Sequence, residues 1–154
     1  MIERVIAIAK QASKEIIKIY NSDNFNTEIK DDDSPVTKAD LIANKIIVDG
    51  LKEISNYPII TEEEPVGYEL RKHWSKFWLV DPLDGTKDFI AKNDEFTINI
   101  ALVENNKPIL GVVYVPVQND VYYAELRKGA YKNENKIYNS SVREDLIASD
   151  SNFH

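Results

Sequence analysis

A short apolar run that ends in two carboxylates constrains the fold of this chain most. Residues 77–80 read F-W-L-V, which predicts a buried strand that stops at Asp81. A proline and a glycine then force the backbone to turn before Thr86 can begin a helical turn. Asp81 and Asp84 therefore lie on one tight bend at the carboxyl end of a strand, where both side chains can reach the same small volume.

This bend suits phosphate chemistry. Two neighbouring carboxylates repel each other unless a cation lies between them, and oxygen ligands with no Cys or His nearby favour Mg²⁺ over zinc. The Leu83 carbonyl would add a further oxygen ligand, and the amides of Gly85 and Thr86 would form a place for an anion. The letters D-P-L-D-G are also common in plain turns, so the motif alone leaves both interpretations open.

The composition fits one globular domain. The chain has 154 residues, of which 43% are hydrophobic, so it can form a core of its own. It contains no cysteine, which excludes disulfides, a thiol nucleophile and a cysteine zinc site and favours a reducing compartment. Residues 1–12 mix charges into an amphipathic pattern unlike a signal peptide, and no apolar run reaches membrane-spanning length. We therefore expect a cytoplasmic protein without stable membrane insertion.

The net charge of -7 argues against binding to a nucleic acid polymer, which needs a basic surface. A phosphate ligand on so acidic a protein would need cations to accompany it. The charge therefore agrees with a metal-binding role for the bend.

Two amphipathic helices are predicted, over residues 2–20 and 37–54, because apolar residues recur there at helical spacing. Residues 27–30 predict a short strand, and the three Asp at 31–33 an acidic turn whose carboxylates suit solvation as well as a metal. Thr37 and Asp40 have the spacing of a capping box, in which Asp40 meets free backbone N–H groups at the start of the second helix. A functional role for Asp40 competes with this interpretation.

A second apolar strand, at residues 58–60, also ends in carboxylates. It runs into T-E-E-E-P, and Glu62 lies nearest the strand, which makes it the best candidate for a third ligand on the same cation. Glu64 and Pro65 are predicted to begin a helix that continues to His73. His73 itself fits a surface or packing position better than a catalytic one.

The pattern after the bend changes to β. Apolar and polar residues alternate over 96–103, and β-branched or aromatic runs follow at 109–115 and 121–124, with short edge strands at 129–131 and 136–138. We therefore predict an α+β fold in which two amphipathic helices pack on an antiparallel sheet. Carboxylates from two strand ends and one helix start would then converge at one edge of the sheet.

Several linked stretches of the sequence resemble a known family. They are T-E-E at 61–63, W-L-V-D-P-L-D-G-T-K-D-F-I at 78–90, P-V-T-K-A-D at 35–40, and N-I-A-L at 99–102 leading to P-I-L-G-V-V-Y at 108–114. Together they resemble the Mg²⁺-dependent inositol monophosphatase superfamily, and within it the bacterial CysQ-type 3'(2'),5'-bisphosphate nucleotidases. The resemblance covers nearly the whole chain and implies the first half of an αβαβα sandwich.

The resemblance also implies roles for individual residues. Glu62, Asp81 and the Leu83 carbonyl match the ligands of a first Mg²⁺, while Asp81 and Asp84 match ligands of a second. The substrate phosphate would accept hydrogen bonds from the Gly85 and Thr86 amides. Asp40 matches a carboxylate that bonds the Thr86 hydroxyl, and this pair would orient and deprotonate the attacking water together with Glu62. Glu63 would support a weaker third metal through water.

The activity implied is removal of the 3'-phosphate from adenosine 3',5'-bisphosphate, giving AMP and phosphate, in sulfate assimilation. The substrate would thus be a small-molecule phosphate ester. Two other functions stay open: an inositol or sugar monophosphatase, and a non-catalytic metal- or phosphate-binding remnant of an enzyme.

The chain departs from the family at its end. Relatives continue into a second α/β domain, whereas this sequence stops at residue 154. The expectation is that residues 1–154 form an N-terminal metal- and phosphate-binding α+β domain, that the C-terminal domain is absent, and that hydrolysis by this chain is impaired. A further expectation is an exposed apolar face, through which a homodimer could form.

Overall fold

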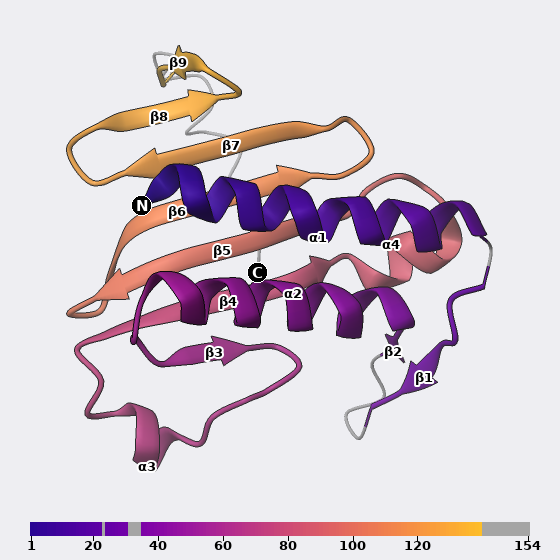
Figure 1. Cartoon of the computed structure of the whole chain (residues 1–154), viewed down its shortest axis with the longest axis horizontal. Coiled ribbons are helices and arrows are strands. Elements are labelled where there is room, and N and C mark those ends of the chain that lie inside the picture. Colours follow the sequence, from indigo (N-terminus) through magenta and orange to yellow (C-terminus); the bar gives the residue numbers. More distant parts are fainter. Residues whose placement is uncertain (23, 31–34, 140–154) are drawn as a thin grey trace, which may run out of the picture.

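Two helices cover one face of a seven-stranded sheet in the computed structural model, which describes residues 1–22, 24–30 and 35–139 (Figure 1). The helices are α1 (Ile2–Ser22) and α2 (Lys38–Ile54), and they lie side by side and run roughly along the direction of the strands. In the sequence between these two helices, β1 (Glu28–Ile29) and β2 (Pro35–Val36) form a small antiparallel pair. The predicted α+β architecture and both predicted helices are confirmed.

The sheet has the strand order β3-β4-β5-β6-β7-β8-β9. Its strands are β3 (Ile59–Thr61), β4 (Lys76–Asp84), β5 (Thr97–Glu104), β6 (Lys107–Val115), β7 (Asp120–Glu125), β8 (Gly129–Lys132) and β9 (Asn135–Ile137). From β4 onward every neighbouring pair is antiparallel, which confirms the predicted meander. The exception is β3, which pairs in parallel with β4, so the carboxyl ends of these two strands lie at the same edge.

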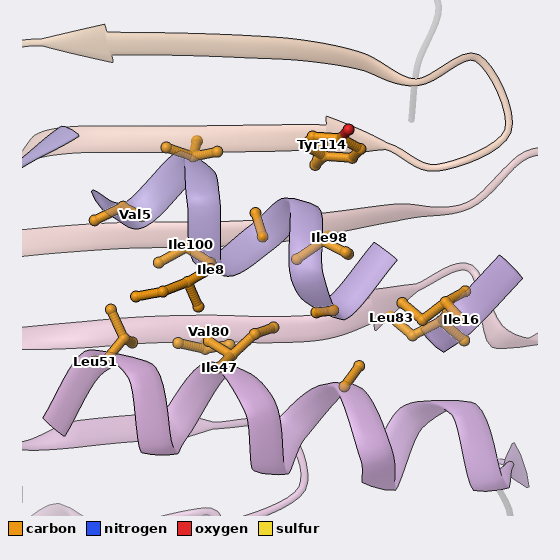
Figure 2. Close-up of a cluster of buried hydrophobic side chains, with 14 of the residues drawn as sticks. Val5, Ile8, Ile16, Ile47, Leu51, Val80, Leu83, Ile98, Ile100 and Tyr114 are labelled. Carbon is orange, nitrogen blue, oxygen red and sulfur yellow. The ribbon is translucent and has the colours of Figure 1, made fainter. Parts of the chain in front are cut away.

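The core lies between the helices and the sheet. Figure 2 shows Ile47 and Leu51 of α2 pointing toward Val80 of β4, while Ile8 of α1 lies near Ile100 of β5. These side chains are buried because each helix places an apolar stripe on the sheet at 3.6-residue spacing. Gly50 lets the two helices approach closely, since a Cβ there would lie 2.8 Å from Ile8 Cγ1. The helix α2 thus packs against β4, the strand that carries Asp81 and Asp84.

The prediction of a helix from Glu64 to His73 is wrong, because the helix in the structure is much shorter. The structure has only a short helix, α3 (Tyr68–Arg71), and Glu64 belongs to a turn instead. The Glu64 amide donates to Thr61 Oγ1 over 2.8 Å, which closes the chain back on the end of β3. The acidic turn predicted at residues 31–33 lies outside the described residues.

The face of the sheet opposite the helices carries apolar side chains. Leu79 and Val113 are 48% and 39% exposed there, and the neighbouring positions Ile60, Ala101 and Gly111 line a shallow hollow of about 550 Å³. The alternation of β4 produces this arrangement, since Trp78 and Val80 point to the helices and Leu79 to the other side. Dimerisation through this face stays a prediction. Within the described ranges, no helix is both long and apolar enough to span a membrane.

Candidate active site

The parallel pairing of β3 and β4 brings Glu62 and Asp81 together. Thr61 is in register with Val80, so the residues that follow them, Glu62 and Asp81, lie at the same edge of the sheet. The Glu62 amide continues the ladder by donating to the Val80 carbonyl over 3.1 Å. Two carboxylates that are 19 positions apart in the sequence are thus neighbours in space, as the sequence predicted.

Asp81 is the most perturbed carboxyl group at this edge. Burial, the negative charges of Glu62 and Asp84 and a hydrogen bond with the Glu62 carboxyl raise the pKa of Asp81 to about 7. A hydrogen bond from the backbone at Leu83 acts in the opposite direction. Asp81 Oδ1 is buried and has no hydrogen-bond partner within the described structure. A buried carboxylate in this position is expected to take up either a proton or a cation.

Asp84 lies on the irregular stretch of β4 where the register with β5 shifts between Asp81 and Asp84. Its Oδ2 accepts a hydrogen bond from Asn99 Nδ2 over 3.0 Å, and Asn99 Oδ1 accepts from Thr97 Oγ1 over 3.2 Å. Asn99 is also the cross-strand partner of Asp81 on β5. It therefore holds Asp84 beside Asp81, a role that the sequence analysis did not assign because it follows only from the strand pairing.

Gly85 makes the sharp turn into α4 (Thr86–Ala91) possible. Its φ angle is +95°, and a Cβ at this position would lie 2.7 Å from the Glu95 carbonyl oxygen. Only glycine fits without a backbone shift. The turn places the Gly85 and Thr86 amides at the start of the helix, but their role in phosphate binding stays a prediction.

Asp40 makes the contacts of both roles that the sequence left as alternatives. Its Oδ2 accepts hydrogen bonds from the Thr37 amide over 2.8 Å and the Thr37 hydroxyl over 2.5 Å, which completes the capping box of α2. Its Oδ1 accepts from Thr86 Oγ1 over 2.8 Å. Asp40 is only 1% exposed, so this carboxylate is a rigid link between the helix and the bend.

Glu63 points toward Lys30, which the sequence analysis did not connect with the site. Lys30 Nζ lies 2.8 Å from Glu63 Oε1 and 3.5 Å from Glu62 Oε1. Burial raises the pKa of Glu63 and outweighs the opposing effect of Lys30. Burial also works against the Lys30 charge, but the hydrogen bond and charge of Glu63, helped by the charge of Glu62, raise the pKa of Lys30 overall. No local sequence signal links these residues.

Asn44 fixes the turn that carries Glu62. Its Nδ2 donates to Glu64 Oε1 over 2.7 Å, and its side chain is largely buried in α2. Asn44 lies four residues after Asp40 and so on the same face of the helix. That spacing could have suggested a shared role, because one face of α2 contacts the segments after both β3 and β4.

The predicted metal ligands meet in pairs. Glu62 adjoins Asp81, and the negative charge of Asp84 also acts on the Asp81 carboxyl group. Glu62 is further paired with Lys30, and Asp84 with Asn99. Among the residues that the structure describes, no three Asp, Glu, His or Cys side chains are gathered closely enough to hold a metal ion. The donors are all oxygen atoms, and Asp81 Oδ1 is buried without a hydrogen-bond partner in the described structure, so the chemistry fits a hard cation such as Mg²⁺. The ligand assignment stays a prediction.

The fold and this edge define a class of protein: an α+β domain in which a helix-capping carboxylate, a threonine hydroxyl and acidic strand ends are brought to one place. Comparison with known proteins agrees, since residues 1–153 match the inositol monophosphatase family. The chain belongs to this family.

Individual relatives support a finer similarity. The chain is 48% identical over 136 residues to 3'(2'),5'-bisphosphate nucleotidase CysQ of Escherichia coli K12, which covers 87% of this chain and 55% of the relative. It is 47% identical to the protein of the same description from Buchnera aphidicola, again over 87% of this chain and 51% of the relative. The chain thus spans about half the length of the curated relatives it matches.

Solved structures show the same fold. CysQ from Bacteroides thetaiotaomicron matches 96% of this chain and 54% of its own, with a TM-score of 0.75 and 39% identity. The suhB protein of Bartonella henselae matches 90% of this chain and 54% of its own, with a TM-score of 0.80 and 28% identity. The resemblance to the inositol monophosphatase family and to its CysQ branch is therefore confirmed.

Proposed function

We propose that this protein is a Mg²⁺-dependent phosphatase that removes the 3'-phosphate of adenosine 3',5'-bisphosphate, giving AMP and phosphate. The observation that carries the proposal is the buried, unpaired Oδ1 of Asp81 beside the carboxyl group of Glu62. This pair lies at the edge where Asp40 accepts a hydrogen bond from Thr86. The choice of substrate is supported by the similarity to relatives described as 3'(2'),5'-bisphosphate nucleotidases.

The residues that would hold Mg²⁺ are Glu62, Asp81, Asp84 and the carbonyl of Leu83. Glu62 is paired with Lys30 and Asp84 with Asn99 in this structure, so each of these carboxylates would exchange a present partner for the cation. When bound, Mg²⁺ would neutralise the phosphate charge and activate water for attack on phosphorus.

The chain's own residues would position the water. The Thr86 hydroxyl donates a hydrogen bond to Asp40, which leaves the lone pairs of Oγ1 available to accept from a water molecule. Asp40 cannot turn away, because its other oxygen is held by the amide and hydroxyl of Thr37. This arrangement allows the pair to take up part of the positive charge that develops as the water loses its proton.

We also propose the cytoplasm as the place of action and sulfate assimilation as the process. The lack of cysteine fits a reducing compartment. The link to sulfate assimilation rests on the resemblance to the CysQ branch alone.

The test is phosphate release from adenosine 3',5'-bisphosphate, together with calorimetric binding of that nucleotide, on the native chain and on an Asp81→Asn variant. We expect nucleotide binding that requires Mg²⁺, is removed by EDTA and is lost in the variant. Phosphate release should show the same dependence but be weak, in keeping with the expectation that hydrolysis by this chain is impaired. myo-Inositol 1-phosphate serves as the competing substrate. A preference for the inositol ester would indicate an inositol or sugar phosphate as the substrate instead of the nucleotide. Nucleotide binding that is the same without Mg²⁺ and in the Asp81→Asn variant would contradict the proposal.

A further inference from the structure

Lys30 places an ammonium group against two carboxylates at the edge where the cation is proposed to bind. Its Nζ is 2.8 Å from Glu63 Oε1 and 3.5 Å from Glu62 Oε1. The side chains of Lys30 and Glu63 are 23% and 7% exposed, whereas that of Glu62 is 50% exposed. Lys30 is thus held firmly by Glu63 and only loosely by Glu62.

The β1–β2 pair brings this lysine to the site. Lys30 directly follows β1, and β2 leads into Thr37 and the capping box of α2. The residue is therefore anchored next to the segment that presents Asp40. An ammonium group in this place supplies one positive charge to a cluster whose carboxylates otherwise repel one another.

We propose that Lys30 is a built-in counter-ion that competes with the divalent cation for Glu62 and keeps Glu63 from binding it. The inference rests on the proposed function, because it concerns the cation that this function requires. Glu62 must release Lys30 before both of its oxygens can face Asp81, and the ammonium repels any cation bound there. Glu63 retains Lys30 as its partner, so it does not serve as a ligand while the lysine is in place.

The test is Mg²⁺ binding to the full chain by calorimetry, repeated with Mn²⁺, which allows bound ions to be counted by electron paramagnetic resonance. Lys30→Met is expected to bind Mg²⁺ more tightly by roughly threefold or more, since a nearby positive charge is removed at low effective dielectric. Lys76→Met is the matched control. Lys76 pairs with Glu104 over 2.9 Å and is 26% exposed, but it lies at the other end of β4.

The outcomes separate this inference from the proposed function. Asp81→Asn should abolish Mg²⁺ binding; if the native chain shows no Asp81-dependent binding, the metal site of the proposed function fails and the role of Lys30 fails with it. If binding depends on Asp81 but Lys30→Met binds as weakly as the native chain or more weakly, only the inference is overturned.

The double variant Lys30→Met/Glu63→Gln keeps the native net charge and provides a second measurement. Competition at Glu62 predicts that it binds Mg²⁺ more tightly than the native chain, and weaker binding would contradict the inference. Circular dichroism checks the fold of each variant, and Lys30→Gln replaces Lys30→Met if the latter does not fold.

Discussion

Thr86 donates a hydrogen bond from Oγ1 to Asp40 Oδ1 over 2.8 Å, and this bond joins residues 46 positions apart in the sequence. It connects the first turn of α2 to the start of α4, directly behind the bend that carries Asp81 and Asp84. The same carboxylate caps α2, so helix capping and the geometry of the site depend on one group.

Replacing Thr86 with valine should reduce phosphate release by roughly 100-fold or more, because the group that orients the water is lost. Thr86→Ser keeps the hydroxyl and should retain most of the activity. Both rates are measured at saturating Mg²⁺ with adenosine 3',5'-bisphosphate. Similar rates for Thr86→Val and Thr86→Ser would show that the hydroxyl has no part in the reaction.

Stability without metal should depend on the pH through Asp81. Its pKa is raised to about 7 in the folded chain from an ordinary value of 3.8, so between these values the folded state binds a proton that the unfolded state does not. Unfolding free energy should therefore fall as the pH rises from about 4 to 7 and level off above that.

Urea unfolding in EDTA at several pH values measures this dependence, with Asp81→Asn as the comparison. Subtracting the variant removes the contribution of other titrating groups, including Glu63, whose pKa is also raised by burial. A native chain and variant with the same pH profile would show that the Asp81 carboxyl is not perturbed.

Gly85→Ala should destabilise the chain by about 3 kcal/mol, since the left-handed φ of +95° is combined with a Cβ contact of 2.7 Å to a backbone carbonyl. Gly67→Ala is the control, because Gly67 has a φ of -58° and a methyl group added there would meet nothing within 4 Å. Its unfolding free energy should stay within about 0.5 kcal/mol of the native value. Equal effects of the two substitutions in urea unfolding would rule out strain at Gly85.

Asn44→Leu should weaken Mg²⁺ binding because it frees the turn that presents Glu62. The hydrogen bond from Asn44 to Glu64 would be lost, at a cost in stability of about 1 kcal/mol. Glu64→Gln retains an oxygen acceptor for Asn44 and should bind Mg²⁺ like the native chain. If calorimetry gives the same affinity for Asn44→Leu and Glu64→Gln, the Asn44–Glu64 contact does not position Glu62.

The elements of the fold were predictable because their signals are local. The 3.6-residue apolar spacing of α1 and α2 and the alternation of β5 each depend on a few consecutive residues. The capping box at Thr37 is equally local, and the structure contains both of its hydrogen bonds. The helix predicted from Glu64 failed because Thr61 and Asn44 bind Glu64 from outside that segment.

The sequence by itself determined the two long helices, the meander and the placement of Glu62, Asp81 and Asp84 where apolar strand segments end. Only the tertiary structure decided their partners: Glu62 beside Asp81 through the parallel β3–β4 pairing, Asp84 against Asn99, and Lys30 on Glu63. Secondary structure follows from short-range periodicity, whereas contacts between polar and charged side chains depend on which distant segments the core packs together.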